Sequence, residues 1–123
     1  IRAGDASLYS AVYGPRFAVQ SSDAFARAIG YPEAPIDDLL VFHIVFGKTV
    51  PDISLNAVAN LGYADGRFLR PVYAGDTLST TSEVIGLKQT SAGDAGIVYV
   101  RSIGRNQNAE IVLSYARWVL VRK

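Results

Sequence analysis

Three side chains that could carry proton-transfer chemistry stand close together between residues 37 and 43. Asp37 and Asp38 are adjacent carboxylates, and His43, the single histidine of the chain, lies five residues after the second of them. A carboxylate and an imidazole can together take a proton from water and deliver one to carbon, so Asp38 and His43 form a candidate acid–base pair. Whether they can act together depends on the element that carries them.

That element is the segment PIDDLLVFHIVFGKTV, residues 35–50. Pro35 ends whatever precedes it, either Asp37 or Asp38 can cap a helix, and His43 is the one residue between 39 and 46 that is not apolar. We expect a central helix that is buried on all sides, because its apolar residues lie all around it. A buried strand is the alternative, since valine, isoleucine and phenylalanine are common in strands.

Helical geometry argues against a joint role for Asp38 and His43. Five residues subtend roughly 500° on a helix, which leaves the two side chains roughly 140° apart. They cannot readily converge on one water molecule. We therefore expect His43 to be a core histidine with a local hydrogen bond, and Asp37 and Asp38 to be N-caps. A functional role for His43 and substrate contact by the two aspartates remain the alternatives.

Composition limits the classes of function. The chain has 123 residues, half of them apolar, which suffices for one domain with a core. A net charge of +1 with interspersed acids and bases argues against nucleic-acid binding, and the absence of cysteine excludes disulfides and thiolate chemistry. We expect a cytoplasmic protein without membrane contact, because no apolar run approaches the roughly 20 residues of a span and no signal peptide is visible. The chain begins with Ile1 and contains no methionine, which predicts a processed chain or a fragment.

Short helices before residue 35 and strands after residue 54 complete the pattern. One helix is expected up to Gly14 and a second from the N-cap Ser22 to Gly30. Strands are expected at 55–69, 77–87, 96–104 and 111–121, with turn sequences at 90–96 and 106–110. Gly86 breaks the alternation of its strand and predicts a bulge. A buried helix followed by an antiparallel meander predicts an α+β hotdog fold, in which an antiparallel sheet wraps around a central helix.

The stretch FLRPVYAGDTL, residues 68–78, reads as a strand that is interrupted in its middle. Pro71 removes a hydrogen-bond donor, and Gly75-Asp76 is a turn dipeptide. We expect one strand to end at Pro71 and the next to open at Thr77. An ordinary β-turn could have the same composition.

The spacing Phe-x-x-Pro-Val-x-x-Gly-Asp-Thr in this stretch resembles the signature of MaoC-like hydratases and dehydratases. Together with DDLLVFHIVFGKTVPDISLNAVANLGYADGRF and YAGDTLSTTSEVIGL, it resembles the mesaconyl-CoA hydratases, also called β-methylmalyl-CoA dehydratases. The resemblance runs from about Asp5 to Lys123. Members of this family are hydro-lyases that add or remove water across the double bond of a branched C4 dicarboxylyl-CoA thioester.

The resemblance also implies a domain organisation. Family chains carry two hotdog domains, so residues 1–123 would form a single MaoC-like hotdog domain, the amino-terminal half of such a chain without its first strand. The implied partners are an acyl-CoA substrate and the second hotdog domain of the same chain, with a homo-oligomer as the assembly. No metal or redox cofactor is implied.

The family's catalytic dyad has the pattern Gly-Asp-x-x-x-x-His, which falls on GPRFAVQ in this chain. Gly14 matches, but Pro15 stands in place of the acid and Gln20 in place of the histidine. Neither proline nor glutamine can transfer a proton at neutral pH. We therefore expect the dyad in the missing half, and a supporting role in substrate binding for this half, with no catalytic residue assigned to it.

Substrate contacts follow from the resemblance as well. Hotdog enzymes hold the pantetheine arm beside the strand after the central helix and direct the thioester at the amino end of that helix, where backbone N–H groups favour a developing negative charge. The substrate-binding residues would then be Pro35, Ile36, Asp37, Asp38, Val58, Ala59, Asn60, Leu61, Leu69, Arg70 and Pro71. Arg67 or Arg70 could pair with a phosphate or a substrate carboxylate, or both could be solvated surface residues.

Two other functions fit the same residues. A non-catalytic hotdog module that binds acyl-CoA or dimerises is the main alternative to an enzyme. A thioesterase is a weaker candidate, because the central helix carries no acid at the position which that chemistry requires.

Overall fold

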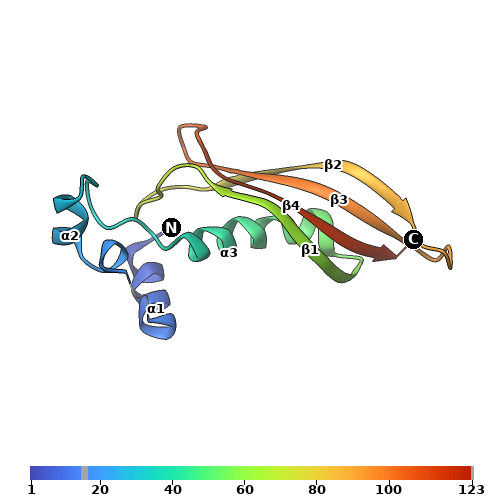
Figure 1. The fold of residues 1–123 in the computed structure, drawn as a ribbon, viewed down its shortest axis with the longest axis horizontal. Coiled ribbons are helices and arrows are strands. Elements are labelled where there is room, and N and C mark those ends of the chain that lie inside the picture. Colours follow the sequence, from blue (N-terminus) through green and yellow to red (C-terminus); the bar gives the residue numbers. More distant parts are fainter. Residues whose placement is uncertain (15–16, 123) are drawn as a thin grey trace.

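A computed structural model describes residues 1–14 and 17–122 of the chain (Figure 1). Its elements follow in the order α1 (Ala3–Tyr13), η1 (Ala18–Gln20), α2 (Asp23–Ala28), α3 (Asp38–Thr49), η2 (Val50–Ser54), β1 (Ala57–Phe68), β2 (Ser79–Gln89), β3 (Ala95–Arg105) and β4 (Ile111–Arg122). The four strands form one antiparallel sheet in the order β1-β4-β3-β2. The helices in the described part of the chain are all too short or too polar to cross a bilayer.

The predicted α+β hotdog arrangement is confirmed: the curved sheet lies along α3, while α1 and α2 lie beyond the amino end of α3 (Figure 1). The core cluster forms between the helix, strand β4 and the segment between β1 and β2. Val41 and Val45 of α3 are buried in one cluster with Leu113 and Tyr115 of β4. This packing fixes which side of α3 faces the sheet.

Helix α3 is not buried on all sides, contrary to the prediction. Val41, Val45 and Thr49, four positions apart, form the buried stripe, whereas the side chain of Leu39 is 57% exposed and His43 is also exposed. The physical reason is that the sheet covers one face of the helix and the described chain provides no second layer. The interpretation of His43 as a core histidine is wrong for the same reason.

The predicted strands are confirmed with small shifts at their ends. β1 ends at Phe68 rather than Pro71, and β2 begins at Ser79 rather than Thr77. The expected bulge is present, because the register of β2 against β3 shifts between Val84 and Gly86. The interrupted motif is thus a loop between two strands.

The Gly-Asp pair of the motif closes that loop. Gly75 has φ +100°, a conformation that favours glycine. The carboxylate of Asp76 accepts hydrogen bonds from the backbone N–H of Tyr73 at 2.9 Å and from Nε2 of Gln107 at 2.8 Å. In this chain the aspartate of the motif stabilises a turn.

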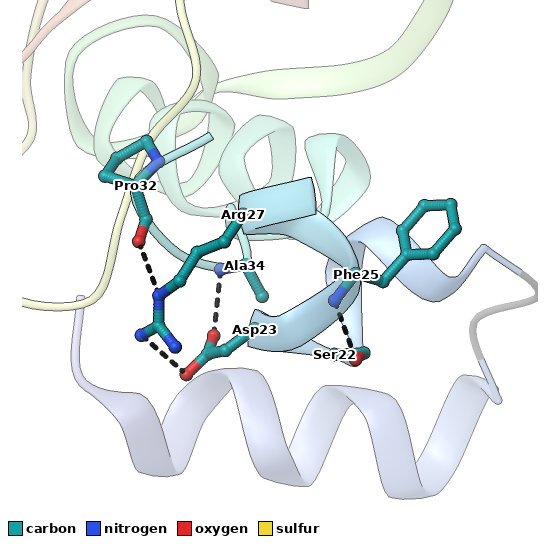
Figure 2. Close-up of polar contacts among 6 residues, drawn as sticks. All are labelled: Ser22, Asp23, Phe25, Arg27, Pro32 and Ala34. Atoms are coloured by element: carbon teal, nitrogen blue, oxygen red, sulfur yellow. Dashed lines mark hydrogen bonds and ion pairs between the residues drawn. The ribbon is translucent and has the colours of Figure 1, made fainter. Parts of the chain in front are cut away.

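Local capping contacts position the helices before α3. Gly14 ends α1 in a left-handed conformation, as the sequence predicts. Figure 2 shows that Ser22 caps α2 through a hydrogen bond from the Phe25 N–H to its Oγ at 3.2 Å. Asp23 Oδ1 accepts from the backbone N–H of Ala34 at 2.9 Å (Figure 2).

A second contact of α2 holds the segment that leads into α3. Arg27 donates from Nε to the carbonyl of Pro32 at 3.0 Å and lies 3.7 Å from the Asp23 carboxylate (Figure 2). The loop 29–35 is thus anchored at Pro32 and Ala34, which follow Tyr31. This anchoring sets the position of the chain that enters α3.

Arg117, which interrupts the apolar face of β4, is buried at the carboxyl end of α3. Its Nη2 donates to Oγ1 of Thr49 at 3.1 Å and to Oγ of Ser54 at 2.9 Å, and its Nη1 donates to Oδ1 of Asn60 at 3.0 Å. The guanidinium carbon lies 4.7 Å from the centre of the Phe46 ring. The carbonyl groups at the end of a helix carry partial negative charge, which favours a cation at this place.

Candidate active site at the amino end of helix α3

The amino end of α3 is held by one cap and by a hydrogen bond to the motif loop. Oδ1 of Asp37 accepts from the backbone N–H of Leu39 at 2.8 Å, so the predicted N-cap is confirmed for Asp37. Ile36, which is 4% exposed, donates from its backbone N–H to the carbonyl of Val72 at 2.8 Å. The start of the helix is therefore tied to the loop that follows β1.

A pocket of about 310 Å³ opens at this end of the helix. Its walls come from η1, the loop before α3, the first residue of α3, and the end of β1 with the residues that follow. They comprise Val19, Gln20, Tyr31, Pro35, Ile36, Asp38, Phe68, Leu69, Arg70 and Pro71. Segments about 50 positions apart in the sequence thus meet around the first turn of α3.

The structure brings six of the predicted substrate-binding residues to this pocket: Pro35, Ile36, Asp38, Leu69, Arg70 and Pro71. It places Val58, Ala59, Asn60 and Leu61 in the first half of β1, outside the pocket wall. Asp37 caps the helix beside the pocket. A binding role for each of these residues stays a prediction.

Asp38 is the carboxylate in the pocket wall. Loss of solvent around its carboxyl group, and then the negative charge of Asp37, raise the pKa of Asp38 above its ordinary value. The Asp38 carboxylate belongs to the first residue of α3, at the end of the helix where the helix dipole carries partial positive charge. Asp38 is exposed and is the one acidic side chain in the described wall of this pocket.

Arg70 is the cation of the pocket wall, and it has an acidic neighbour. Its Nη1 lies 3.3 Å from Oε1 of Glu110, and the two side chains are 57% and 39% exposed. An exposed pair of this kind contributes little to stability, so Arg70 can exchange this partner for a ligand anion at small cost. Arg67, the alternative cation, is exposed on β1 and is not part of the pocket wall.

The structure describes one of the two positions at which the catalytic dyad of the family is predicted to be lost. Gln20 lies in the pocket wall with Asp38, whereas Pro15 lies outside the described residues. His43 is exposed on α3 and does not line the pocket, in agreement with the prediction that Asp38 and His43 do not converge.

Sequence reasoning missed Val19, Tyr31 and Phe68 as wall residues. Val19 adjoins Gln20, so the motif could have indicated it. Tyr31 sits in a loop with no pattern of its own, which α2 holds through hydrogen bonds at the neighbouring Pro32 and Ala34. Among the described residues, no three histidine, cysteine, aspartate or glutamate side chains gather in a way that could hold a metal ion.

Relatives with assigned names match the whole chain. It is 66% identical to a β-methylmalyl-CoA dehydratase from Chloroflexus aurantiacus and 63% identical to a mesaconyl-CoA hydratase from Cereibacter sphaeroides. All of this chain is covered in both cases, but only 35% and 36% of the relatives. The chain therefore spans about a third of the length of these relatives.

Solved structures agree with these matches. A crystal structure of a MaoC domain protein dehydratase from Chloroflexus aurantiacus matches with a TM-score of 0.97 and 66% identity, covering 100% of this chain and 35% of that one. A protein of Mycobacterium tuberculosis with a double hotdog fold matches with a TM-score of 0.90 and 25% identity, covering 99% of this chain and 38% of the other.

The match to a family model gives the assignment. The model described as mesaconyl-CoA hydratase matches residues 13–123, which include the pocket walls, α3 and the complete sheet. The chain belongs to the mesaconyl-CoA hydratase family.

Proposed function

We propose that the complete protein is a hydro-lyase that adds water to mesaconyl-CoA or removes it from β-methylmalyl-CoA, and that residues 1–123 support substrate binding. The observation that carries this proposal is identity of 63–66% to relatives with these names over the whole chain, pocket walls included. No metal or redox cofactor is required by this chemistry, and the expectation that none is used stays a prediction.

The pocket suits the carbonyl of a thioester. Hydration of an enoyl thioester passes through a state in which the carbonyl oxygen gains negative charge. Backbone N–H groups of the first turn of α3 carry partial positive charge at the pocket, and Ile36 and Pro35 bring apolar surface beside them. A thioester oxygen directed at this end of the helix would be stabilised in the transition state.

The same pocket lacks a pair of groups that could run the reaction by themselves. Gln20 stands at the position of the family's histidine, and Asp38 is the one carboxylate in the described wall. Hydration needs a base for water and an acid for the α-carbon. We infer that the dyad lies in a second hotdog domain of the complete protein.

A second domain would also cover the surface that this chain leaves open. Leu39 of α3 is 57% exposed, and Val58, Leu61 and Tyr63 of β1 are each about half exposed. A partner that packed against α3 and β1 would remove these apolar side chains from water. The match of this chain to 38% of a protein with a double hotdog fold supports a second hotdog domain as the partner.

The test compares the complete polypeptide with residues 1–123 in an assay that follows loss of the enoyl-thioester absorbance of mesaconyl-CoA. We expect turnover by the complete protein, and turnover by residues 1–123 that is lower by at least about a hundredfold, because acid–base groups contribute about 10² to 10⁴. Circular dichroism shows whether residues 1–123 are folded during the assay.

Two results would contradict parts of this proposal. Comparable turnover by both proteins would show that residues 1–123 carry a catalytic acid and base of their own, and would assign catalysis to Asp37, Asp38 or His43. A complete protein that binds mesaconyl-CoA without hydrating it would favour the alternative of a non-catalytic acyl-CoA-binding module.

A further inference from the structure

The outer face of the sheet, which is the face turned away from α3, is apolar at its centre. Figure 1 shows α3 along one face, and none of the described helices lies over the other. Arg117 of β4 points toward α3, so the next residue, Trp118, points outward. By strand register the outer face also carries Ile97, Tyr99 and Leu120, and all four of these apolar residues are partly exposed. Since an antiparallel sheet with one face in water normally carries polar side chains there, this composition indicates a covered face.

Two aromatic rings stand at the centre of the outer face, with space beside them. The rings of Tyr99 and Trp118 are stacked, with centroids 4.5 Å apart and an angle of 8° between their planes. Trp118 pairs with Gly62 of β1, and Tyr99 pairs with Gly86 of β2, so a row of glycine, tryptophan, tyrosine and glycine crosses the four strands. A cavity of about 380 Å³ lies beside the rings, with Gly86 in its wall. Rings of a facing surface can lie in the space that the glycines leave.

Two opposite charges flank this row on β2. Lys88 and Glu83 lie on either side of Gly86, and both are exposed. Their cross-strand partners, Ile97 and Arg101, share the outer face with the residue between them in the alternation of β3, so both charged side chains belong to this face. A second copy turned by 180° about an axis along the row would place its Glu83 opposite Lys88 and its Lys88 opposite Glu83. The face is therefore complementary in charge to itself, as an interface between two identical surfaces requires.

The size of the outer face is sufficient for a stable association. Its strands are 11 or 12 residues long. Four strands about 4.8 Å apart, with a rise of about 3.3 Å per residue, give an area on the order of 700 Å². A stable interface buries about 800 Å² on each partner. The second hotdog domain proposed above would pack against α3 and the edge strand β1, and would leave the outer face free.

We propose that the outer face of the sheet binds the outer face of a second copy of the complete protein, with the twofold axis along the glycine–tryptophan–tyrosine–glycine row. Tyr99 and Trp118 supply the apolar centre of this interface, because aromatic side chains bring a large contact area. Two pairs of Lys88 with Glu83, formed between the copies, fix how the copies are aligned. The inference concerns assembly, so it holds whether or not the protein hydrates mesaconyl-CoA.

Charge reversal on β2 tests the alignment of the two copies in the complete protein. Lys88→Glu sets a carboxylate opposite Glu83 of the facing copy at two places. It should raise the dissociation constant of the assembly about tenfold, as measured by sedimentation velocity without substrate. Glu83→Lys should weaken the assembly to a similar extent. The double variant should restore it, because positions 83 and 88 are about 16 Å apart along one strand and can meet only between copies.

Asp94→Lys is the matched control, because Asp94 is exposed in the turn before β3 and lies outside the strands that form the face. We expect it to leave the dissociation constant unchanged. Trp118→Lys tests the apolar centre, since the interface would have to bury an unpaired ammonium group. It should halve the mass of the complete protein in solution. Far-UV circular dichroism shows whether each variant is folded.

Several results would overturn the inference. A complete protein that sediments as a single chain at micromolar concentration would refute it. An assembly that Trp118→Lys leaves intact would show that another surface joins the copies. If that variant instead lowers the melting temperature without loss of association, another segment of the same chain covers the outer face. Charge reversals without effect, or a double variant that associates as weakly as Lys88→Glu, would refute the proposed axis.

Discussion

Gly104 of β3 lies directly against Val45 of α3. A Cβ atom at Gly104 would come within 2.8 Å of Cγ2 and 3.1 Å of Cγ1 of Val45, whose side chain is 0% exposed. The helix can approach the sheet this closely because the strand has no side chain at that position. This contact sets the distance between α3 and β3, and it yields the first prediction.

Gly104→Ala should lower the free energy of unfolding by about 1–3 kcal/mol, because Val45 is β-branched and buried and cannot move aside. Gly96→Ala on the same strand is the control, since its Cβ would meet its nearest neighbour at 3.7 Å. Denaturant unfolding measures both. Adding Val45→Ala to Gly104→Ala should recover part of the lost free energy of unfolding. If the losses of the two single variants simply add in the double variant, the side chains at 45 and 104 do not clash.

Val41→Asp should prevent folding. Val41 is 2% exposed in the core cluster, and an unpaired carboxylate there costs several kcal/mol. Lys48→Asp, at an exposed position of the same helix, should cost less than about 1 kcal/mol. Soluble expression and melting temperature report both effects, and an unchanged melting temperature for Val41→Asp would refute the packing of α3 against the sheet.

His43→Ala should change neither the stability nor the rate of the complete enzyme by much. The side chain is exposed and lies outside the pocket wall, so its removal leaves no cavity and takes no group from the substrate. A core histidine with a local hydrogen bond would instead have cost stability on removal. A fall in kcat of a thousandfold with a normal melting temperature would give His43 a catalytic role.

Asp38 should make the protein less stable as pH rises. The pKa of Asp38 is raised in the folded state, through loss of solvent and then the charge of Asp37, so the folded protein binds more protons than the unfolded chain between the ordinary and the raised pKa. The free energy of unfolding therefore falls as pH rises through that window. Asp38→Asn should remove this slope, whereas Asp52→Asn, at an exposed position of η2, should preserve it.

Much of the local structure followed from the residues alone. Ser22 and Asp37 cap their helices as predicted, since a cap needs only a side-chain oxygen and a neighbouring N–H. The bulge at Gly86 and the turn at Gly75 also depend on a few adjacent residues. Strand ends shifted by two or three positions because hydrogen bonds to neighbouring strands decide them.

The tertiary structure decided which sides of those elements are covered. The apolar residues of 39–46 surround the helix, so their pattern could not tell that Val41 and Val45 face the sheet while Leu39 and His43 do not. A charge within the apolar face of β4 could likewise have been solvent-exposed. Its burial follows from acceptors on α3, η2 and β1, which only the folded chain brings together.

The candidate site divides in the same way. The family resemblance implies that the residues at the start of α3 and those after β1 belong to one site, but a pocket forms only if the two segments lie close together. A backbone hydrogen bond between Ile36 and Val72, which are 36 positions apart in the sequence, holds the two segments together. Sequence determined which groups the chain carries and which short elements they form, because those depend on neighbours along the chain. Tertiary structure decided which groups meet, because burial and long-range hydrogen bonds depend on neighbours in space.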